Sequence, residues 1–282
     1  MSVEIFDRDG AKLNAQFLGF AGGERHIQLD PDRVHKIPAP RILTLRAALT
    51  SSDAVFDLIL ACDALLRIDN ALRFQIELPY LPYARQDRVC APGQAFSLDA
   101  FVRLIGTIGN IDQIVVWDCH SQAGLELTRA INVEPAEIIA RNAELTALIK
   151  APGSVLICPD KGAIGRTRAI AEAFDTAAIA YADKARNPRT GEIANIVLDG
   201  TPLEGKTAII TDDICDGGYT FTLLAKALRE RGVARIILYV THGIFSRGFE
   251  VFDGLIDKIY ASDSFDGRDA NILTTIRFQY PF

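Results

Sequence analysis

The chain has 282 residues, of which 49% are hydrophobic and 23% charged, and its formal net charge at pH 7 is -6. This composition is typical of a globular protein with one large domain or two smaller ones. The acidic balance argues against a nucleic-acid binder, and we expect no membrane segment because no long apolar run occurs. Five widely spaced cysteines, an odd number, favour a reducing cytoplasm.

Short apolar strands alternate with helical patterns along the chain, which predicts an α/β fold with a mainly parallel sheet. In the first half we expect a capped helix at 51–71, a strand at 73–80, a helix at 96–109 and a strand at 113–120. In the second half we expect strands at 154–160, 177–183, 207–213 and 235–243, a helix at 164–174, and another that ends before Gly232. The shared order of the two halves predicts two tandem α/β units.

One segment joins an apolar strand, Ala208 to Ile210, to two carboxylates, Asp212 and Asp213, and then to a glycine turn and a helix. Gly217 and Gly218 let the backbone turn with its N–H groups inward, and the start of the next helix adds partial positive charge, which suits a phosphate. The two carboxylates repel a phosphate but accept hydrogen bonds from two ribose hydroxyls. The segment therefore predicts a site for a phosphorylated sugar.

Four polar clusters precede this segment. Arg85 and Arg88 follow a strand end and offer donors to a polyphosphate. Asp118 and His120 form an acid-x-histidine pair, which we expect on one side of an extended chain as metal ligands. The other two clusters are a glycine-containing turn at 159–162 and the string Asp183-Lys184-Ala185-Arg186. The latter opens a polar segment, 185–205, which indicates a mobile loop or a short hairpin beside a site.

Taken in order, the YARQDR string, the acid-x-histidine pair, the PD-x-G turn, the DK-x-R loop and the DDI-x-D loop resemble the ribose-phosphate pyrophosphokinases, also called phosphoribosyl diphosphate synthetases. The resemblance runs from about Phe20 to about Ser264. It implies an α/β fold of two phosphoribosyltransferase-like domains, an ATP-side domain at 1–140 and a domain at 141–282 with the pyrophosphate and ribose 5-phosphate loops. The implied reaction transfers the β,γ-diphosphoryl group of ATP to the anomeric hydroxyl of ribose 5-phosphate, giving phosphoribosyl diphosphate and AMP.

The resemblance also assigns roles to residues. The implied ATP contacts are Phe20, Glu24, Arg85, Gln86, Asp87 and Arg88, of which a neighbouring subunit supplies the first two. Magnesium is held by His120 and Asp160, and the loop from Asp160 to Arg166 holds the pyrophosphate. The implied catalytic residues are Lys184, Arg186 and His120. The ribose phosphate contacts are Asp212, Asp213, Asp216, Gly217, Gly218, Tyr219 and Thr220. The implied partners are ATP, ribose 5-phosphate and further copies of the chain, as a dimer or hexamer.

Three alternatives stay open. A phosphoribosyltransferase shares the DDI-x-D loop but joins the activated sugar to a base, and a non-catalytic regulatory homologue binds nucleotide without turnover. The third is diphosphoryl transfer onto a larger acceptor such as ADP-ribose, because Tyr219 places a ring at the mouth of the 5-phosphate loop, where it either stacks on the acceptor or only covers the helix start. The tail after Ser264 does not match the family's usual ending. Oligomer contacts and regulation by nucleotides are therefore the family properties that the resemblance supports least for this chain.

Overall fold

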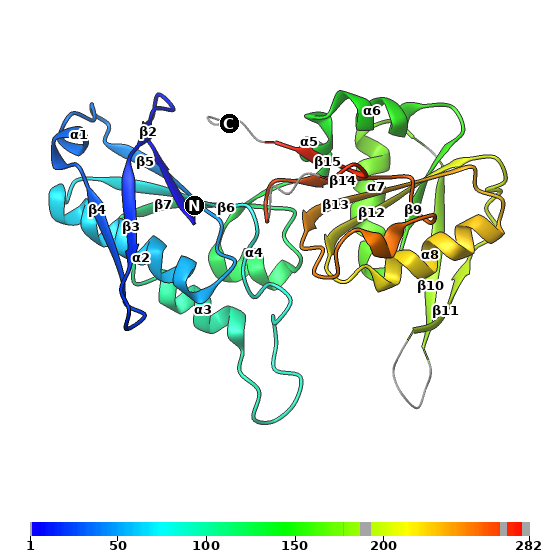
Figure 1. Ribbon diagram of the computed structural model, residues 1–282, viewed down its shortest axis with the longest axis horizontal. Helices are drawn as coiled ribbons and strands as arrows, with labels where there is room; N and C mark the ends of the chain where they lie inside the picture. Colours follow the sequence, from blue (N-terminus) through cyan, green and yellow to red (C-terminus); the bar gives the residue numbers. More distant parts are fainter. Residues whose placement is uncertain (1, 177, 187–192, 266–269, 278–282) are drawn as a thin grey trace. The chain divides into compact units, whose positions relative to one another are not determined.

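The computed structural model describes residues 2–176, 178–186, 193–265 and 270–277. These residues fall into two compact units, a first unit at 2–133 and a second unit at 134–277 (Figure 1). Each unit has a β-sheet of its own and a hydrophobic core of its own. The functional limits given above, with ATP binding in residues 1–140, stay a prediction.

The first unit is built on a six-stranded sheet in the order β2-β1-β5-β6-β7-β8, with a separate two-stranded hairpin, β3-β4. Its strands are β1 (Val3–Phe6), β2 (Lys12–Leu13), β3 (Ala15–Gly19), β4 (Arg25–Leu29), β5 (Ile42–Ala47), β6 (Arg73–Leu78), β7 (Ile111–Trp117) and β8 (Ile131–Val133). Strand β1 is antiparallel to both of its neighbours, whereas β5 to β8 run parallel. The parallel strands therefore end at one edge of the sheet, where the polar clusters follow.

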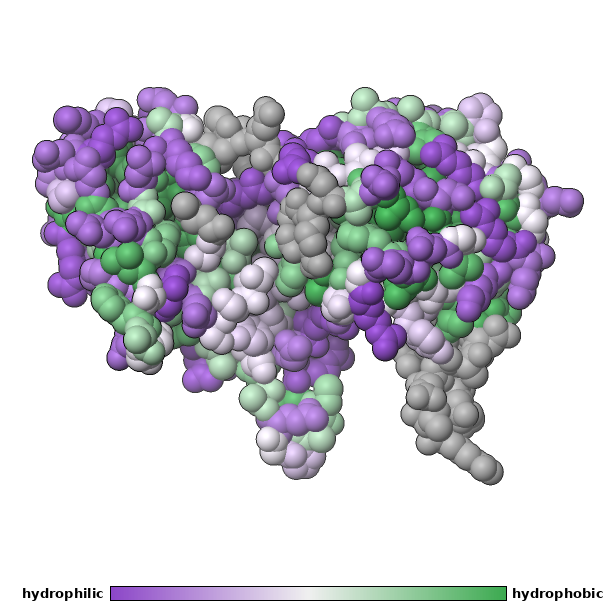
Figure 2. All heavy atoms as spheres, in the orientation of Figure 1, coloured by the Kyte–Doolittle hydropathy of each residue, from purple (hydrophilic) through white to green (hydrophobic). Residues whose placement is uncertain are grey.

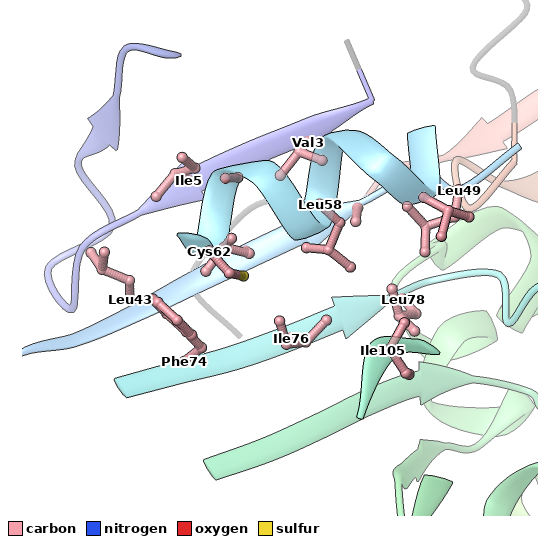
Figure 3. Close-up of a cluster of buried hydrophobic side chains, with 14 of the residues drawn as sticks. Val3, Ile5, Leu43, Leu49, Leu58, Cys62, Phe74, Ile76, Leu78 and Ile105 are labelled. Atoms are coloured by element: carbon pink, nitrogen blue, oxygen red, sulfur yellow. The ribbon is translucent and has the colours of Figure 1, made fainter. Parts of the chain in front are cut away.

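Helices cover this sheet and supply its core. They are α1 (Pro31–His35), α2 (Ser52–Ile68), α3 (Ser97–Ile105) and α4 (Gln122–Thr128). Helix α2 begins where the Ser51 side chain accepts a hydrogen bond from the backbone N–H of Ala54, at 3.2 Å. Figure 3 shows Leu58 and Cys62 of α2 facing the fully buried side chains of Ile5 on β1 and Ile76 on β6. The apolar face of α2 thus fixes the strands whose ends carry the site.

The second unit is built on a seven-stranded sheet in the order β11-β10-β9-β12-β13-β14-β15, parallel except for the antiparallel pair β10-β11. Its strands are β9 (Ser154–Cys158), β10 (Ile179–Arg186), β11 (Ile193–Leu198), β12 (Thr207–Cys215), β13 (Arg235–Gly243), β14 (Lys258–Ser262) and β15 (Leu273–Ile276). The central strands are buried on both faces, which is why they read as continuous apolar runs.

The helices of the second unit are α5 (Pro135–Ala140), α6 (Ala143–Lys150), α7 (Ile164–Ala173) and α8 (Tyr219–Glu230), with 3-10 turns η1 (Lys161–Ala163) and η2 (Glu250–Phe252). Helix α8 packs Phe221, Leu224 and Leu228 into the core. Helix α7 is joined to β12 by a buried hydrogen bond between the hydroxyls of Thr167 and Thr211, at 3.0 Å. This bond links α7 to the strand that carries the acid pair.

Most predicted elements are confirmed, including the helix at α2 and the strands at β6, β9, β12 and β13. The prediction for 185–205 is confirmed in its hairpin form, because β10 continues to Arg186 and pairs with β11; residues 187–192 lie outside the described residues. The hairpin β3-β4 and the short strand β8 were not predicted from the sequence.

The surface drawn in Figure 2 is mainly hydrophilic on both units, with hydrophobic side chains in small groups between the polar ones. Among the residues that the structure describes, no helix combines the length and the apolar character needed to span a bilayer. All five cysteines are free thiols.

Candidate functional site

A cavity of about 990 Å³ lies in the first unit and contains most of the residues assigned to ATP. Its lining residues of predicted function are Arg85, Gln86, Asp87, Arg88 and His120. The YARQDR string follows β6 and His120 follows β7, and these strands are parallel neighbours, so the fold brings the two clusters to one edge of the sheet. The cavity is large enough for a nucleotide triphosphate.

The turn that carries the YARQDR string is held by local contacts. Tyr83 has a positive φ of 63°, its carbonyl accepts the Gln86 N–H at 2.8 Å, and its ring packs on Phe101 of α3 with ring centroids 5.6 Å apart. Arg88 pairs with Asp87 through two hydrogen bonds of 2.8 and 3.2 Å, and this pairing lowers the pKa of Asp87. Asp87 therefore holds Arg88, which also lines the cavity, and does not act as a proton donor near neutral pH.

Asp118 and His120 do not lie on an extended chain, so that prediction is wrong. Strand β7 ends at Trp117, and Asp118 adopts a left-handed backbone with φ of 39°. As a result, the Asp118 side chain is buried while His120 is exposed and lines the cavity. Only the histidine of the pair is placed to meet a ligand.

Phe20 and Glu24 lie at the end of the β3-β4 hairpin and do not line the cavity. Two backbone hydrogen bonds of 2.9 Å, from Phe20 N–H to the Glu24 carbonyl and from Gly23 N–H to the Phe20 carbonyl, close the turn. The Phe20 side chain is 57% exposed, which is unusual for a large aromatic residue. The hairpin therefore presents an aromatic ring at the surface of the first unit.

In the second unit, Asp160 begins the turn after β9. Its Oδ1 accepts hydrogen bonds from the backbone N–H groups of Gly162 (2.9 Å) and Ala163 (3.2 Å), so it caps the turn before α7. His120 and Asp160 belong to different units, and the described residues contain no group of three or more metal-binding side chains. Asp160 supplies a carboxylate, which is the type of ligand that magnesium prefers, and magnesium binding by His120 and Asp160 stays a prediction.

Lys184 and Arg186 lie on the last part of β10, in the hairpin with β11. Lys184 pairs with Ile196 and Arg186 with Ile193, with a β-bulge between Ala185 and Arg186. Just before them, Asp183 forms an ion pair of 3.3 Å with Lys161 of the Asp160 turn. The hairpin base is therefore tied to the turn predicted to hold pyrophosphate.

Asp212 and Asp213 lie side by side near the end of β12, and Arg166 of α7 pairs with both. The distances are 3.0 Å from Arg166 Nη2 to Asp213 Oδ2 and 3.6 Å from Arg166 Nη1 to Asp212 Oδ1. Burial and then the charge of Asp213 raise the pKa of Asp212, while Arg166 opposes the rise. The acid pair thus places two carboxylates side by side next to the Arg166 guanidinium.

The predicted 5-phosphate turn runs from Asp216 to the start of α8. Gly218 has φ of 77°, and a Cβ at this position would lie 2.7 Å from the Phe252 ring, so only glycine fits. Helix α8 begins at Tyr219, and Thr220 lies in its first turn. Tyr219 is 53% exposed. The turn therefore offers backbone N–H groups and a helix start to an anion.

Two residues beside this turn were missed by sequence reasoning. Ser246 donates a hydrogen bond of 2.6 Å from its hydroxyl to Asp216 Oδ1. The aliphatic part of the Arg247 side chain packs on Gly217, and its Cδ lies 3.2 Å from the position that a Cβ would take at residue 217. No hydrogen bond or ion pair engages Arg247 within the described residues. The only sequence signal was the loop after the β13 strand, since parallel neighbours end at the same edge.

Comparison with known proteins places the chain in a family. A family model for the phosphoribosyl transferase domain matches residues 131–259. A ribose-phosphate pyrophosphokinase of Maricaulis maris (strain MCS10) is 31% identical over 265 residues, covering 92% of this chain and 80% of the relative, and one of Pyrococcus abyssi (strain GE5 / Orsay) is 29% identical over 247 residues, covering 87% and 81%.

A solved structure, phosphoribosylpyrophosphate synthetase from Mycobacterium smegmatis, shares the fold with a TM-score of 0.78 and 22% identity, covering 95% of this chain and 87% of that chain. The predicted fold class is therefore confirmed. The chain belongs to the ribose-phosphate pyrophosphokinase family.

Proposed function

We propose that the protein is an ATP-dependent ribose-phosphate diphosphokinase, which transfers the β,γ-diphosphoryl group of ATP to the anomeric hydroxyl of ribose 5-phosphate. One observation carries the proposal: the chain that holds an acid pair and a phosphate turn in its second unit also holds an arginine-lined cavity of about 990 Å³ in its first. A base-joining phosphoribosyltransferase has no need of the second feature. The relatives' names support the same reading.

On the donor side, Arg85, Gln86 and Arg88 bind the triphosphate in the first-unit cavity. Asp87 holds Arg88 in place. His120 and Asp160 are the residues that would hold magnesium, which would supply positive charge to the phosphate oxygens. Lys184 and Arg186, at the end of β10, neutralise the group in transfer.

On the acceptor side, Asp212 and Asp213 accept hydrogen bonds from the ribose hydroxyls, and residues 216–220 bind the 5-phosphate. The anomeric oxygen attacks the β-phosphorus, a new O–P bond forms, and the bond from the β-phosphorus to the oxygen of the α-phosphate breaks. AMP leaves with that oxygen, and the hydroxyl proton passes to solvent. No covalent enzyme intermediate is needed, so the residues act by positioning and by charge compensation.

The test is product identification by mass spectrometry after incubation with ATP, magnesium and ribose 5-phosphate, with a reaction lacking magnesium as control. AMP and phosphoribosyl diphosphate in equal amounts are expected. ADP would overturn the reaction type, and consumption of phosphoribosyl diphosphate with a free nucleobase would favour a phosphoribosyltransferase. No turnover with intact ATP binding would favour a regulatory homologue.

A second acceptor class rests on the exposed ring of Tyr219 at the start of α8. The ring is available to stack on a group attached beyond the 5-phosphate, as in ADP-ribose. A parallel assay with ADP-ribose decides between the acceptors, because robust turnover of ribose 5-phosphate alone removes this candidate.

The exposed Phe20 on the β3-β4 hairpin supports a further part of the proposal. In it, the hairpin supplies Phe20 and Glu24 to the adenine of a neighbouring subunit, within a dimer or hexamer in the cytoplasm. Light scattering coupled to size exclusion measures the oligomer directly. A monomer that turns over at the full rate would remove the neighbouring-subunit role.

A further inference from the structure

Arg166 occupies an unusual place for a cation. It lies in the first turn of α7, where the helix start already carries partial positive charge, and a positive side chain there is unfavourable. Its side chain is only 12% exposed. A buried cation at a helix start needs a strong anionic partner to offset the loss of hydration.

The partner is the acid pair of β12. Arg166 Nη2 lies 3.0 Å from Asp213 Oδ2, and the Asp213 side chain is 8% exposed. The other oxygen of Asp213, Oδ1, accepts the Ile214 N–H at 2.7 Å. Both oxygens of Asp213 are therefore engaged by the protein itself.

Asp212 differs from its neighbour. Its Oδ1 accepts the Asp213 N–H at 3.0 Å and faces Arg166 at 3.6 Å, and its side chain is 16% exposed. Its Oδ2 makes no hydrogen bond within the described part of the chain. Within the described residues, Asp212 thus has a carboxylate oxygen that makes no hydrogen bond, whereas both oxygens of Asp213 already accept one.

We propose that Arg166 is a positioning residue for the acceptor sugar: it fixes Asp213 as an internal support, so that Asp212 Oδ2 faces the ribose hydroxyls. This inference rests on the proposed function and revises it in one respect, because Asp213 then supports the site from within and Asp212 alone contacts the ribose hydroxyls. It differs from the family-based assignment, in which the loop from Asp160 to Arg166 serves the pyrophosphate. The guanidinium is turned toward the acids, and the hydrogen bond between the neighbouring residues Thr167 and Thr211 joins α7 to β12 beside this pair.

The test measures which substrate loses affinity when Arg166 is changed. In Arg166→Gln, the KM for ribose 5-phosphate is expected to rise about tenfold or more, because the charge-assisted hydrogen bond that fixes Asp213 is lost. The KM for ATP is expected to stay within about twofold of the parent. Arg166→Lys keeps the positive charge but loses the planar guanidinium, so its KM for ribose 5-phosphate is expected to lie between those of the parent and Arg166→Gln. Arg235→Gln, on an exposed arginine at the opposite end of the sheet, is the matched control.

A second pair of variants keeps the inference testable if Arg166→Gln does not fold. Asp213→Asn is expected to raise the KM for ribose 5-phosphate several-fold less than Asp212→Asn does, because only Asp212 meets the sugar. Equal effects of the two acids would overturn the inference, as would an Arg166→Gln protein whose KM rises for ATP alone or for neither substrate.

Calorimetry with ribose 5-phosphate in the absence of ATP separates this inference from the proposed function. If the parent binds the sugar but forms no AMP, the proposed function fails, and weaker binding by Arg166→Gln still supports the positioning role. If the parent binds no ribose 5-phosphate, both are overturned.

Discussion

The cavity of the first unit and the acid pair of the second differ in how they hold charge. The cavity is lined by exposed side chains such as Arg85 and His120 on loops that follow strands. The acid pair consists of the buried Asp213 and the partly buried Asp212; it lies on the strand itself and is fixed by Arg166 and by backbone N–H groups.

This difference has a physical consequence. Exposed cations bind a flexible polyphosphate and lose little hydration in doing so. Their contributions to the binding free energy are therefore modest and decrease as the salt concentration rises. Buried carboxylates cost free energy in the folded protein, but they recognise a sugar in one orientation. Four predictions, made on three substitutions, test whether the two regions behave in these two ways.

The largest expected effect is that of Asp212→Asn on acceptor use. Loss of the carboxylate removes charge-assisted hydrogen bonds to the ribose hydroxyls, so kcat/KM for ribose 5-phosphate is expected to fall on the order of 100-fold. Steady-state kinetics with ATP saturating give the value, and Asp253→Asn on an exposed acid of the same unit is the control. A fall of less than about threefold would contradict the sugar-binding role.

Arg85→Gln tests the donor side. The KM for ATP is expected to rise about tenfold, because one charge-assisted contact between a cation and the polyphosphate is lost. The KM for ribose 5-phosphate is expected to stay unchanged. The rise is expected to shrink as salt increases. Arg103→Gln, on an exposed arginine of α3 that pairs with Asp99, is the matched control. If Arg85→Gln changed only the KM for ribose 5-phosphate, the assignment of ATP binding to the first unit and sugar binding to the second would be contradicted.

The third prediction concerns stability and pH. Burial raises the pKa of Asp212 in the folded protein, so the stability this group confers is present below its unfolded pKa and is lost as pH rises through the folded value. At pH 8, Asp212→Asn is therefore expected to be more stable than the parent, by about 1.4 kcal/mol for each pKa unit of the rise.

Urea unfolding at pH 8 and at pH 4 measures this difference. The advantage of Asp212→Asn is expected to shrink at the lower pH, where the parent carboxyl binds its proton. A variant less stable than the parent at pH 8 would show that the carboxylate is not strained.

The smallest expected effect is that of Arg247→Gln. Its stem covers Gly217 of the phosphate turn, but the guanidinium is exposed, so loss of its attraction for the 5-phosphate is expected to raise the KM for ribose 5-phosphate about threefold. The same measurement on Arg235→Gln gives the background. If the KM for ribose 5-phosphate does not change, Arg247 is a surface residue without a role in the turn.

The sequence predicted the parallel strands well, because buried strands such as β12 and β13 are continuous apolar runs with polar residues at their ends. It also predicted that polar residues lie at the carboxyl ends of strands in both units. The pairing of Arg166 with Asp213 could not be predicted in this way, since it joins residues 47 positions apart through the rotamer of one side chain.

The buried state of Asp118 escaped prediction for a related reason. An acid after a strand is expected to face solvent, but its left-handed backbone turns the side chain inward. Similarly, Ser246 and Arg247 carry no motif of their own, and only the pairing of β12 with β13 brings them to the phosphate turn. Contacts set by tertiary packing, as opposed to local pattern, account for these omissions.

The surroundings of Gly218 keep the phosphate turn ordered before the ligand binds, which lowers the entropy cost of binding. The Phe252 ring fills the space that a side chain at 218 would take, and Ser246 is bonded to Asp216, so the turn is already braced by the segment after β13. A phosphate that enters such a turn finds its N–H groups in place and does not have to order a loop. Binding of the sugar phosphate is then expected to carry little conformational penalty, with a fast association step.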